Sequence, residues 1–224
     1  MKSFLKLILF RISPNFYDKL RLFYFERKVL PKPFLKHMSK LTSNDLVIDI
    51  GANIGLVSEC LAIRGSKVIS IEPNSKAFTE LEKIAKKYNN IEAHNIAAGT
   101  KDRTTKLYLH NKSQNSEEDF TQSSSLLSKK PNVSKNYFEE IKEIDFAKFI
   151  DNLKSPIELI KIDIEGYEVK LLNHLLDKKV LKKIKKIYVE THEKNFQEIR
   201  KETLKLKKRV IKEGYEEKFY FEWH

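Results

Sequence analysis

The stretch VIDIGANIG, residues 47–55, places two glycines directly after a short apolar run. The run 45–50 (DLVIDI) is typical of a buried parallel strand, and residues 55–64 have the pattern of a helix. Glycine lets the backbone turn tightly and approach a ligand closely. A glycine turn between a strand and a helix indicates a nucleotide-type cofactor at the carboxyl end of the first strand.

The chemistry of that cofactor follows from the residues around the turn. Asn53 stands where a dinucleotide fingerprint has its middle glycine, and the lysine of a phosphate-binding loop is missing. Glu72 ends the next predicted strand about 20 residues after Asp49, a spacing suited to accept hydrogen bonds from both ribose hydroxyls. Asp49 is placed to orient an ammonium through water or backbone. S-adenosylmethionine is therefore favoured over NAD, with Asp49, Gly51, Asn53, Gly55 and Glu72 as candidate cofactor residues.

The remaining pattern alternates predicted strands with predicted helices. Such alternation predicts a doubly wound, mostly parallel sheet of the Rossmann-like α/β class, covered on both faces. Residues 110–136 are rich in Ser, Asn, Gln and Lys and are expected to form a long loop. The expected strands are 67–71, 91–97, 104–109, 157–162, 184–190 and a strand-like stretch 215–223, and the expected helices are 75–87, with Ser75 as N-cap, 167–176 and 195–213.

Length and charge set the domain organisation and the class of partner. The chain has 224 residues and a net charge of +12, which favours anionic partners, and its one cysteine excludes an internal disulfide. Residues 1–33 are expected to form a basic helical appendage and residues 34–224 the main domain. The apolar run of this appendage is far shorter than the run that a membrane span requires. The appendage is therefore expected either to cap the core or to lie on an anionic membrane surface. We expect a cytoplasmic protein, with peripheral contact to the inner face of the membrane as the second alternative.

Six motifs stand in order along the chain: VIDIGANIG at 47–55, IEP at 71–73, NIAAG at 95–99, SSSLL at 123–127, LIKIDIEGYE at 159–168 and ETH at 190–192. Together they resemble the FkbM-type methyltransferases, a family of class I Rossmann-like enzymes. The resemblance covers about residues 45–193. It implies a seven-stranded sheet whose last β-hairpin is shortened here, and O-methylation of a hydroxyl on a sugar, a glycan or glycolipid, or a related natural product. Ala97 and Ala98 become further candidate cofactor residues.

Acidic side chains and one histidine follow two of the predicted strands. Asp163 and Glu165 follow the strand 157–162, whereas Glu190 and His192 follow the next one. In the implied fold these strands are neighbours, so the four side chains are expected to converge beside the methyl group. His192 is the first candidate for the base that removes the hydroxyl proton, and Asp163, crowded by Glu165, is the second.

Two further expectations concern a metal ion and the acceptor. In the alternative mechanism Asp163, Glu190 and His192 hold Mg²⁺, which activates the hydroxyl directly. Ser124 and Ser125 either close over the substrate and supply hydroxyls, or merely fill the loop. Glu168 is interpreted as a first-turn helix residue favoured by the helix dipole. The expected acceptor is a small molecule, a sugar or a lipid-linked glycan.

Two rival functions remain open. The positive charge favours a nucleic-acid methyltransferase, but no amine-methylation motif follows the strand 157–162, and no aromatic RNA-stacking motif is evident. A non-catalytic module that binds S-adenosylmethionine is the other rival, which the intact glycine motif, Glu72 and Asp163 disfavour. Measuring which labelled cofactor the purified protein retains would distinguish a methyltransferase from a dehydrogenase.

Overall fold

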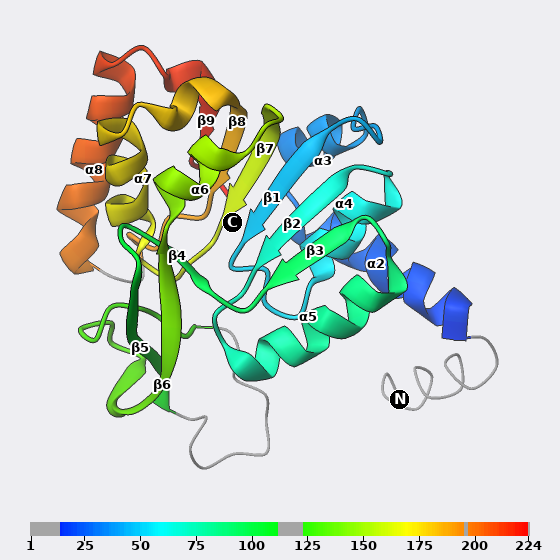
Figure 1. Cartoon of the computed structure of the whole chain (residues 1–224), viewed down its shortest axis with the longest axis horizontal. Helices are drawn as coiled ribbons and strands as arrows, with labels where there is room; N and C mark the ends of the chain where they lie inside the picture. The colour runs from blue at the N-terminus through cyan, green and yellow to red at the C-terminus, as the bar shows by residue number, and fades with distance from the viewer. Residues whose placement is uncertain (1–13, 112–122, 195–196, 224) are drawn as a thin grey trace.

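The computed structural model describes residues 14–111, 123–194 and 197–223 (Figure 1). Outside this part lie residues 1–13, residues 112–122 of the predicted loop 110–136, the first two residues of the predicted helix 195–213, and residue 224. The helices are α2 (Pro14–Val29), α3 (Lys32–Met38), α4 (Leu56–Ile63), α5 (Ser75–Lys87), α6 (Phe146–Asn152), α7 (Glu168–Asp177) and α8 (Gln197–Lys212). The strands are β1 (Leu46–Ile50), β2 (Lys67–Ile71), β3 (Ile91–His94), β4 (Ala97–Gly99), β5 (Arg103–His110), β6 (Val133–Asp145), β7 (Ile157–Ile162), β8 (Ile184–Val189) and β9 (Phe219–Tyr220).

The main sheet has six strands in the order β3-β2-β1-β7-β8-β9, and every neighbouring pair is parallel. The strand order reverses between β1 and β7, because β2 and β3 lie on one side of this pair and β8 and β9 on the other. Ligands bind at such a switch point, outside the carboxyl ends of the strands. The Rossmann-like α/β class is therefore confirmed, with six strands in the main sheet in place of the predicted seven.

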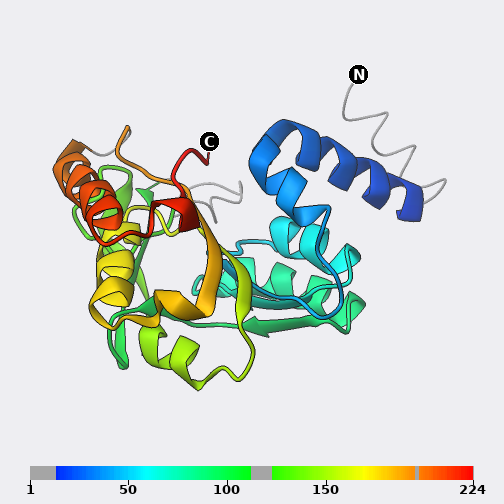
Figure 2. The same ribbon diagram turned by 90° about the horizontal axis from the view of Figure 1, so that it is seen from above.

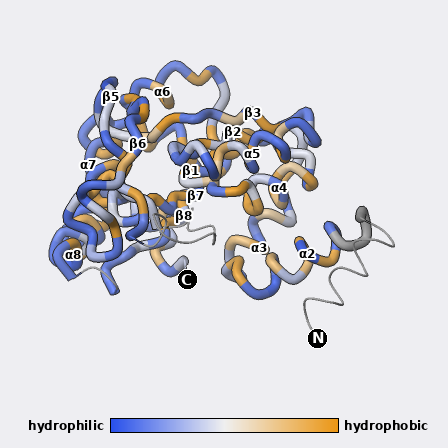
Figure 3. Tube along the Cα trace, turned by 90° about the horizontal axis from the view of Figure 1, so that it is seen from below, coloured by the Kyte–Doolittle hydropathy of each residue, from blue (hydrophilic) through white to orange (hydrophobic). Residues whose placement is uncertain are grey.

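Two apolar cores lie on the two faces of this sheet, because alternate residues of each strand point to opposite sides. On one face, Ile48 and Ile160 pack with α6, α7 and α8. On the other, Val47 and Leu159 pack with α2, α3 and α4. Figure 2 shows the second group set apart from α8 when the molecule is seen from above. Hydrophobic colours concentrate in the strands, whereas the outer helix α8 is largely hydrophilic (Figure 3).

A second sheet of three strands, in the order β4-β6-β5, corrects two sequence-based expectations. The predicted strand 91–97 is two strands, since β3 joins the main sheet and β4 pairs in parallel with β6. The predicted loop 110–136 ends early, because β6 begins at Val133 and pairs antiparallel with β5. The sequence analysis also missed α6, whose N-cap Asp145 accepts hydrogen bonds from the backbone of Ala147 and Lys148.

Smaller corrections concern element ends. The N-cap of α5 is Asn74 rather than Ser75, because the Asn74 side chain accepts a 2.9 Å hydrogen bond from the Ala77 amide. The stretch 215–223 forms a 3₁₀ turn at Glu216–Lys218 and the two-residue strand β9, which pairs in parallel with β8. The described C-terminal residues therefore contain no hairpin. Among the described helices, none combines the length and the apolar character that a membrane span requires.

Candidate active site

The glycine turn lies at the switch point, between β1 and α4. Gly51 has φ +73°, and a Cβ at this position would overlap with the carbonyl oxygen of Asp163, so only glycine fits. Asn53 also adopts a left-handed conformation, with φ +49°. Gly55, the N-cap of α4, packs against α5, where a Cβ would lie 2.8 Å from Leu81 Cδ1. The turn is thus held by close packing against two neighbouring elements.

Glu72 lies beside this turn, at the end of β2. Its Oε2 accepts a 2.8 Å hydrogen bond from the Asn53 amide, and its Oε1 accepts one of 2.8 Å from the Asn74 amide. Burial raises the pKa of Glu72 to about 7, although these two hydrogen bonds act in the opposite direction. Each carboxylate oxygen can accept a second hydrogen bond, so Glu72 retains acceptor sites for two hydroxyls.

A buried lysine, whose role the sequence analysis missed, links the turn to the neighbouring strand. Lys161 of β7 donates a 2.7 Å hydrogen bond from Nζ to the Gly51 carbonyl, and Nζ lies 3.2 Å from Asp49 Oδ1 and 3.7 Å from Asp163 Oδ2. Asp49 is fully buried, and its Oδ2 accepts a 2.7 Å hydrogen bond from Ser58. Asp49 therefore contacts the turn only indirectly, through Lys161.

Three of the four predicted catalytic side chains meet at the ends of β7 and β8. His192 Nε2 lies 3.2 Å from Glu165 Oε2 and 3.7 Å from Asp163 Oδ1. The other ring nitrogen, Nδ1, lies 3.0 Å from Glu168 Oε1, which also accepts hydrogen bonds from the amides of Ile164 and Gly166. Glu168 is buried and fixes both the turn after β7 and the imidazole, which is more than the first-turn role that the sequence indicated.

The charge of His192 differs from the sequence-based expectation. Burial alone would lower its pKa, but the hydrogen bond and the charge of Glu168, with those of Glu165 and Asp163, outweigh burial and raise the pKa to about 9. The imidazole is then protonated at neutral pH, and an imidazolium cannot accept a proton. This raised pKa and the three carboxylates around the ring favour a positioning role for His192, and its assignment as the base stays a prediction.

This charge predicts a pH dependence of stability. Because the folded pKa of His192, about 9, exceeds its ordinary value of 6.5, its contribution is complete below pH 6.5 and is lost as the pH rises through 9. We expect the stability difference between the wild type and His192→Gln to shrink by up to about 3 kcal/mol over that range. Denaturant unfolding of both proteins at pH 6, 7.5 and 9.5 measures it. A pH-independent difference would show that His192 is neutral in the folded protein.

Glu190 occupies a different position from the other three. Among the described residues, no donor forms a hydrogen bond with its carboxyl group, and burial, followed by the charge of Asp163, raises its pKa to about 7. A carboxyl group with a pKa near the working pH combines a large ionised fraction with appreciable basicity. Glu190 is therefore better suited than His192 to accept a proton.

The predicted metal ligands are also rearranged. Asp163, Glu165 and His192, rather than Asp163, Glu190 and His192, offer ligand atoms within 4.8 Å of one another. Cations of the protein already compensate these carboxylates, because Lys130 pairs with Glu165 and Lys161 lies near Asp163. Mg²⁺ prefers oxygen ligands, and a protonated His192 offers it none. This donor set does not fit Mg²⁺.

The two candidate substrate serines differ in their surroundings. Ser125 is buried, donates a 2.8 Å hydrogen bond to the Glu165 carbonyl and accepts one from the Leu127 amide, so its hydroxyl supports the loop. Ser124 Oγ lies 3.4 Å from Asn74 Nδ2. Lys130, which the sequence analysis did not single out, donates to the Ser123 carbonyl and thereby ties the described end of the loop to Glu165.

These groups surround one cavity of about 310 Å³. Three of the predicted site residues, Asp49, Gly55 and His192, do not line this cavity. Phe25, Val29 and Trp223, none of which the sequence analysis proposed, contribute an apolar part of the wall. The predicted site residues that do line the cavity are Gly51, Asn53, Glu72, Ala97, Ala98, Ser124, Ser125, Asp163, Glu165 and Glu190.

A comparison with protein families matches residues 49–216 to the methyltransferase FkbM domain. The chain belongs to the FkbM methyltransferase family. The matched region begins at Asp49 and contains the glycine turn, Glu72 and both acidic strand ends of this methyltransferase. A comparison with curated proteins finds no match.

A comparison with solved structures also finds matches. Precorrin-6y C5,15-methyltransferase from Geobacter metallireducens is 11% identical over 78% of this chain and 68% of its own, with a TM-score of 0.42. The N-terminal domain of human METTL16, in complex with SAH, is 11% identical over 82% and 58%, with a TM-score of 0.41. P. horikoshii TYW2, in complex with MeSAdo, is 28% identical over 32% and 30%, with a TM-score of 0.25. This methyltransferase therefore spans less than a third of the TYW2 chain.

Proposed function

We propose that this methyltransferase uses S-adenosylmethionine to methylate a hydroxyl group of a sugar, a glycan or glycolipid, or a related natural product. The observation that carries the proposal is the pairing, in one cavity, of the Gly51–Glu72 cofactor turn with Glu190, a carboxyl group whose pKa is about 7. An alcohol needs its proton removed as the new bond forms, so a carboxylate base beside the cofactor turn suits O-methylation.

The residues of the cavity fit the proposed cofactor. Glu72 offers the acceptor sites that two ribose hydroxyls require, and Ala97 and Ala98 are small enough to leave room for a ring beside β4. Asp163 lines the cavity, and its Oδ1 forms no hydrogen bond among the described residues, since the nearby His192 Nε2 lies 3.7 Å away. An ammonium group would satisfy such an acceptor, and an unsatisfied buried acceptor is otherwise costly. Polar groups at both ends of the proposed cofactor thus have matching partners.

The proposed mechanism assigns each side chain one task. Glu72 and the backbone of the glycine turn hold the adenosine end, while Lys161 fixes the Gly51 carbonyl. Bound S-adenosylmethionine supplies an electrophilic methyl group. Glu190 accepts the hydroxyl proton, and the imidazolium of His192 keeps Asp163 and Glu165 in place. Phe25 and Trp223 exclude water from one side of the cavity.

The cofactor assignment predicts the effect of Glu72→Ala. We expect the affinity for S-adenosylhomocysteine to fall by about 1–3 kcal/mol, because charge-assisted hydrogen bonds to two hydroxyls are lost. Isothermal titration calorimetry measures the change. Glu80→Ala, which removes an exposed carboxylate from α5, is the matched control and should bind normally. Equal affinity of Glu72→Ala and Glu80→Ala for S-adenosylhomocysteine would show that Glu72 does not bind the cofactor.

The acceptor class is tested with labelled methyl donor. Purified full-length protein is incubated with S-adenosylmethionine carrying a labelled methyl group and with soluble sugars, glycolipids or RNA in separate reactions. Alkali-stable methyl ether on a sugar or glycolipid supports the proposal. Label in RNA alone would favour the rival nucleic-acid methyltransferase, and retained cofactor without transfer to any acceptor class would favour a binding module.

A further inference from the structure

The outer face of α2 is basic and partly apolar. Lys19, Phe23 and Arg27 follow one another at four-residue spacing and are exposed, with the Arg27 guanidinium 4.6 Å from the centre of the Phe23 ring. The two acidic residues of this stretch face the protein instead, because Asp18 pairs with Lys87 and Glu26 pairs with Arg64. The outward face of this helix therefore carries cations and aromatic rings without compensating carboxylates.

Helix α8 also carries exposed basic and apolar side chains on its outer face. Lys201, Leu204, Lys208 and Ile211 are all exposed, and their spacing places them along one stripe of the helix, opposite the buried Leu206. Within the part of the chain that the structure describes, no carboxylate pairs with Lys201 or Lys208. Leu204 and Ile211 are thus exposed to water beside lysines that have no carboxylate partner among the described residues. Exposure of large apolar side chains to water is unfavourable.

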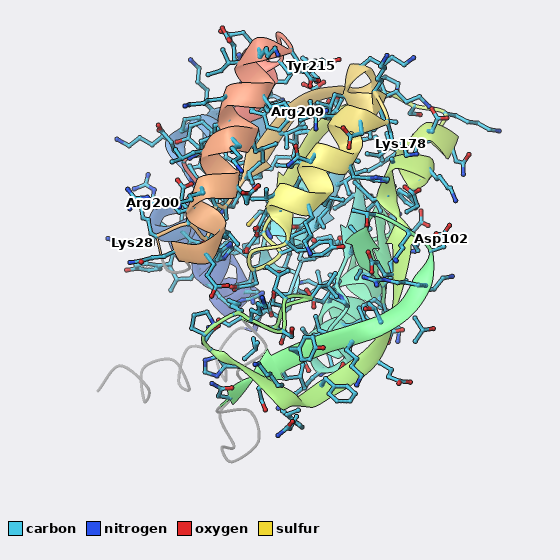
Figure 4. All side chains as sticks on the ribbon, turned by 90° about the vertical axis from the view of Figure 1, so that its left-hand side faces the viewer. Lys28, Asp102, Lys178, Arg200, Arg209 and Tyr215 are labelled. Atoms are coloured by element: carbon cyan, nitrogen blue, oxygen red, sulfur yellow. The ribbon has the colours of Figure 1, made fainter. Side chains whose placement is uncertain are left out.

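Helices α2 and α8 cover opposite faces of the main sheet, but both lie toward one edge of the molecule. Seen from above, α2 and α8 flank the C-terminal segment along one edge, and the view from below shows the same arrangement (Figures 2 and 3). Lys28 of α2 and Arg200 of α8, which are neighbours of the two stripes rather than members of them, project toward the same side in Figure 4. Five of the six exposed large apolar side chains in the described residues belong to these helices: Phe23, Tyr24, Val29, Leu204 and Ile211. Such concentration marks an interaction surface.

The cavity reaches this surface through α2. Phe25 and Val29 line the cavity, Val29 is also 46% exposed, and Trp223 of the C-terminal segment completes the same part of the wall. An acceptor that enters beside α2 therefore passes between apolar side chains at the basic face. A lipid-anchored acceptor has the matching chemistry, since its apolar anchor stays at the surface while its hydroxyl reaches Glu190.

We propose that the α2–α8 face docks on an anionic lipid bilayer and takes its acceptor from that surface. The part of this inference that concerns the acceptor rests on the proposed function. Lysine and arginine draw the face to anionic headgroups, and Phe23, Leu204 and Ile211 enter the boundary between headgroups and acyl chains. Exposed aliphatic side chains add nothing to phosphate binding, so they favour a bilayer over a nucleic acid.

Vesicle flotation of the full-length protein tests the docking surface. The wild type is expected to float with vesicles of phosphatidylglycerol and phosphatidylcholine, but not with phosphatidylcholine alone. Each basic residue near an anionic surface strengthens binding about fivefold, so Lys201→Glu with Lys208→Glu should weaken it more than tenfold. Leu204→Ser with Ile211→Ser should weaken it as well, at unchanged charge.

The controls separate this surface from net charge and from folding. Lys83→Glu with Lys86→Glu on α5 changes the charge equally at exposed positions away from this face, and should leave most binding intact. Ile63→Ser is the matched apolar control. Every variant should keep the melting temperature and the S-adenosylhomocysteine affinity of the wild type, which shows that its fold and its cofactor site are intact.

Three outcomes would overturn the docking proposal. They are a wild type that does not float, α8 variants that float as well as the α5 control, and α8 variants that lose affinity for RNA while vesicles are not bound. Normal cofactor binding and methyl transfer in any of these cases would leave the proposed function standing. Conversely, vesicle binding that depends on α8, with no methyl transfer to any hydroxyl, would overturn the proposed function alone.

Discussion

Glu190→Gln is expected to lower kcat by about 10²-fold or more, the loss that follows removal of a positioned base. Glutamine keeps the size of the side chain but cannot accept the hydroxyl proton. The affinity for S-adenosylhomocysteine should change little, because Glu72 and the glycine turn are untouched. Steady-state kinetics with the acceptor, together with calorimetry for the cofactor product, measure both quantities.

The pH profile adds a second signature of Glu190. Only the carboxylate accepts a proton, so kcat of the wild type should rise with pH through about 7, the raised pKa of this group, and then level off. In Glu190→Gln this rise should disappear. Glu92→Gln, an exposed carboxyl on β3, is the matched control. Near-normal turnover of Glu190→Gln would place the base elsewhere, and loss of activity on chelation would restore the metal alternative.

Lys161→Met is expected to lower the free energy of unfolding by about 3–5 kcal/mol, since it leaves the buried carboxylate of Asp49 without its cation. The Gly51 carbonyl also loses its 2.7 Å hydrogen bond, so cofactor affinity should fall with stability. Denaturant unfolding and calorimetry measure the two effects. Lys83→Met, at an exposed lysine of α5, should have a small effect on both.

A double-mutant cycle identifies the cause of this loss. Asp49→Asn with Lys161→Met removes both charges of the buried pair, so it should recover part of the stability that Lys161→Met alone loses. Additive losses in the double variant would show that the two charges do not interact. A loss below about 1 kcal/mol in Lys161→Met would mean that Asp49 is satisfied by Ser58 alone.

The positions of the glycine turn and of Glu72 could be predicted because they depend on short stretches of chain. The strand, the glycine turn and Gly55 follow one another in sequence, and Glu72 ends the next strand. The turn imposes its own requirements, since Gly51 has to adopt φ +73° beside the Asp163 carbonyl. Local patterns of this kind also located the helices α4, α5 and α7 to within about two residues, the usual uncertainty of helix ends.

The second sheet could not be predicted in this way. β4 follows β3 after only two residues, yet it pairs with β6, more than forty residues further along the chain. The stretch 91–97 gives no sign in its sequence of the change from one sheet to the other, although β4 is fully buried and β3 is only partly buried. Long-range pairing decided where the predicted strand divides.

The sequence by itself determined the α/β class, the family and the carboxyl-end position of the site, because strand periodicity, glycine turns and motif spacing are encoded in consecutive residues. Only the tertiary structure decided which charged groups lie close together and how deeply they are buried, and the proposed proton acceptor follows from both. The pKa of His192 is raised by the carboxylates of Glu168, Glu165 and Asp163, which come from the adjacent segment after β7. Lys161 of β7 lies 3.2 Å from Asp49 of the neighbouring strand β1. Electrostatic interactions depend on distance and burial in space, and separation along the chain specifies neither.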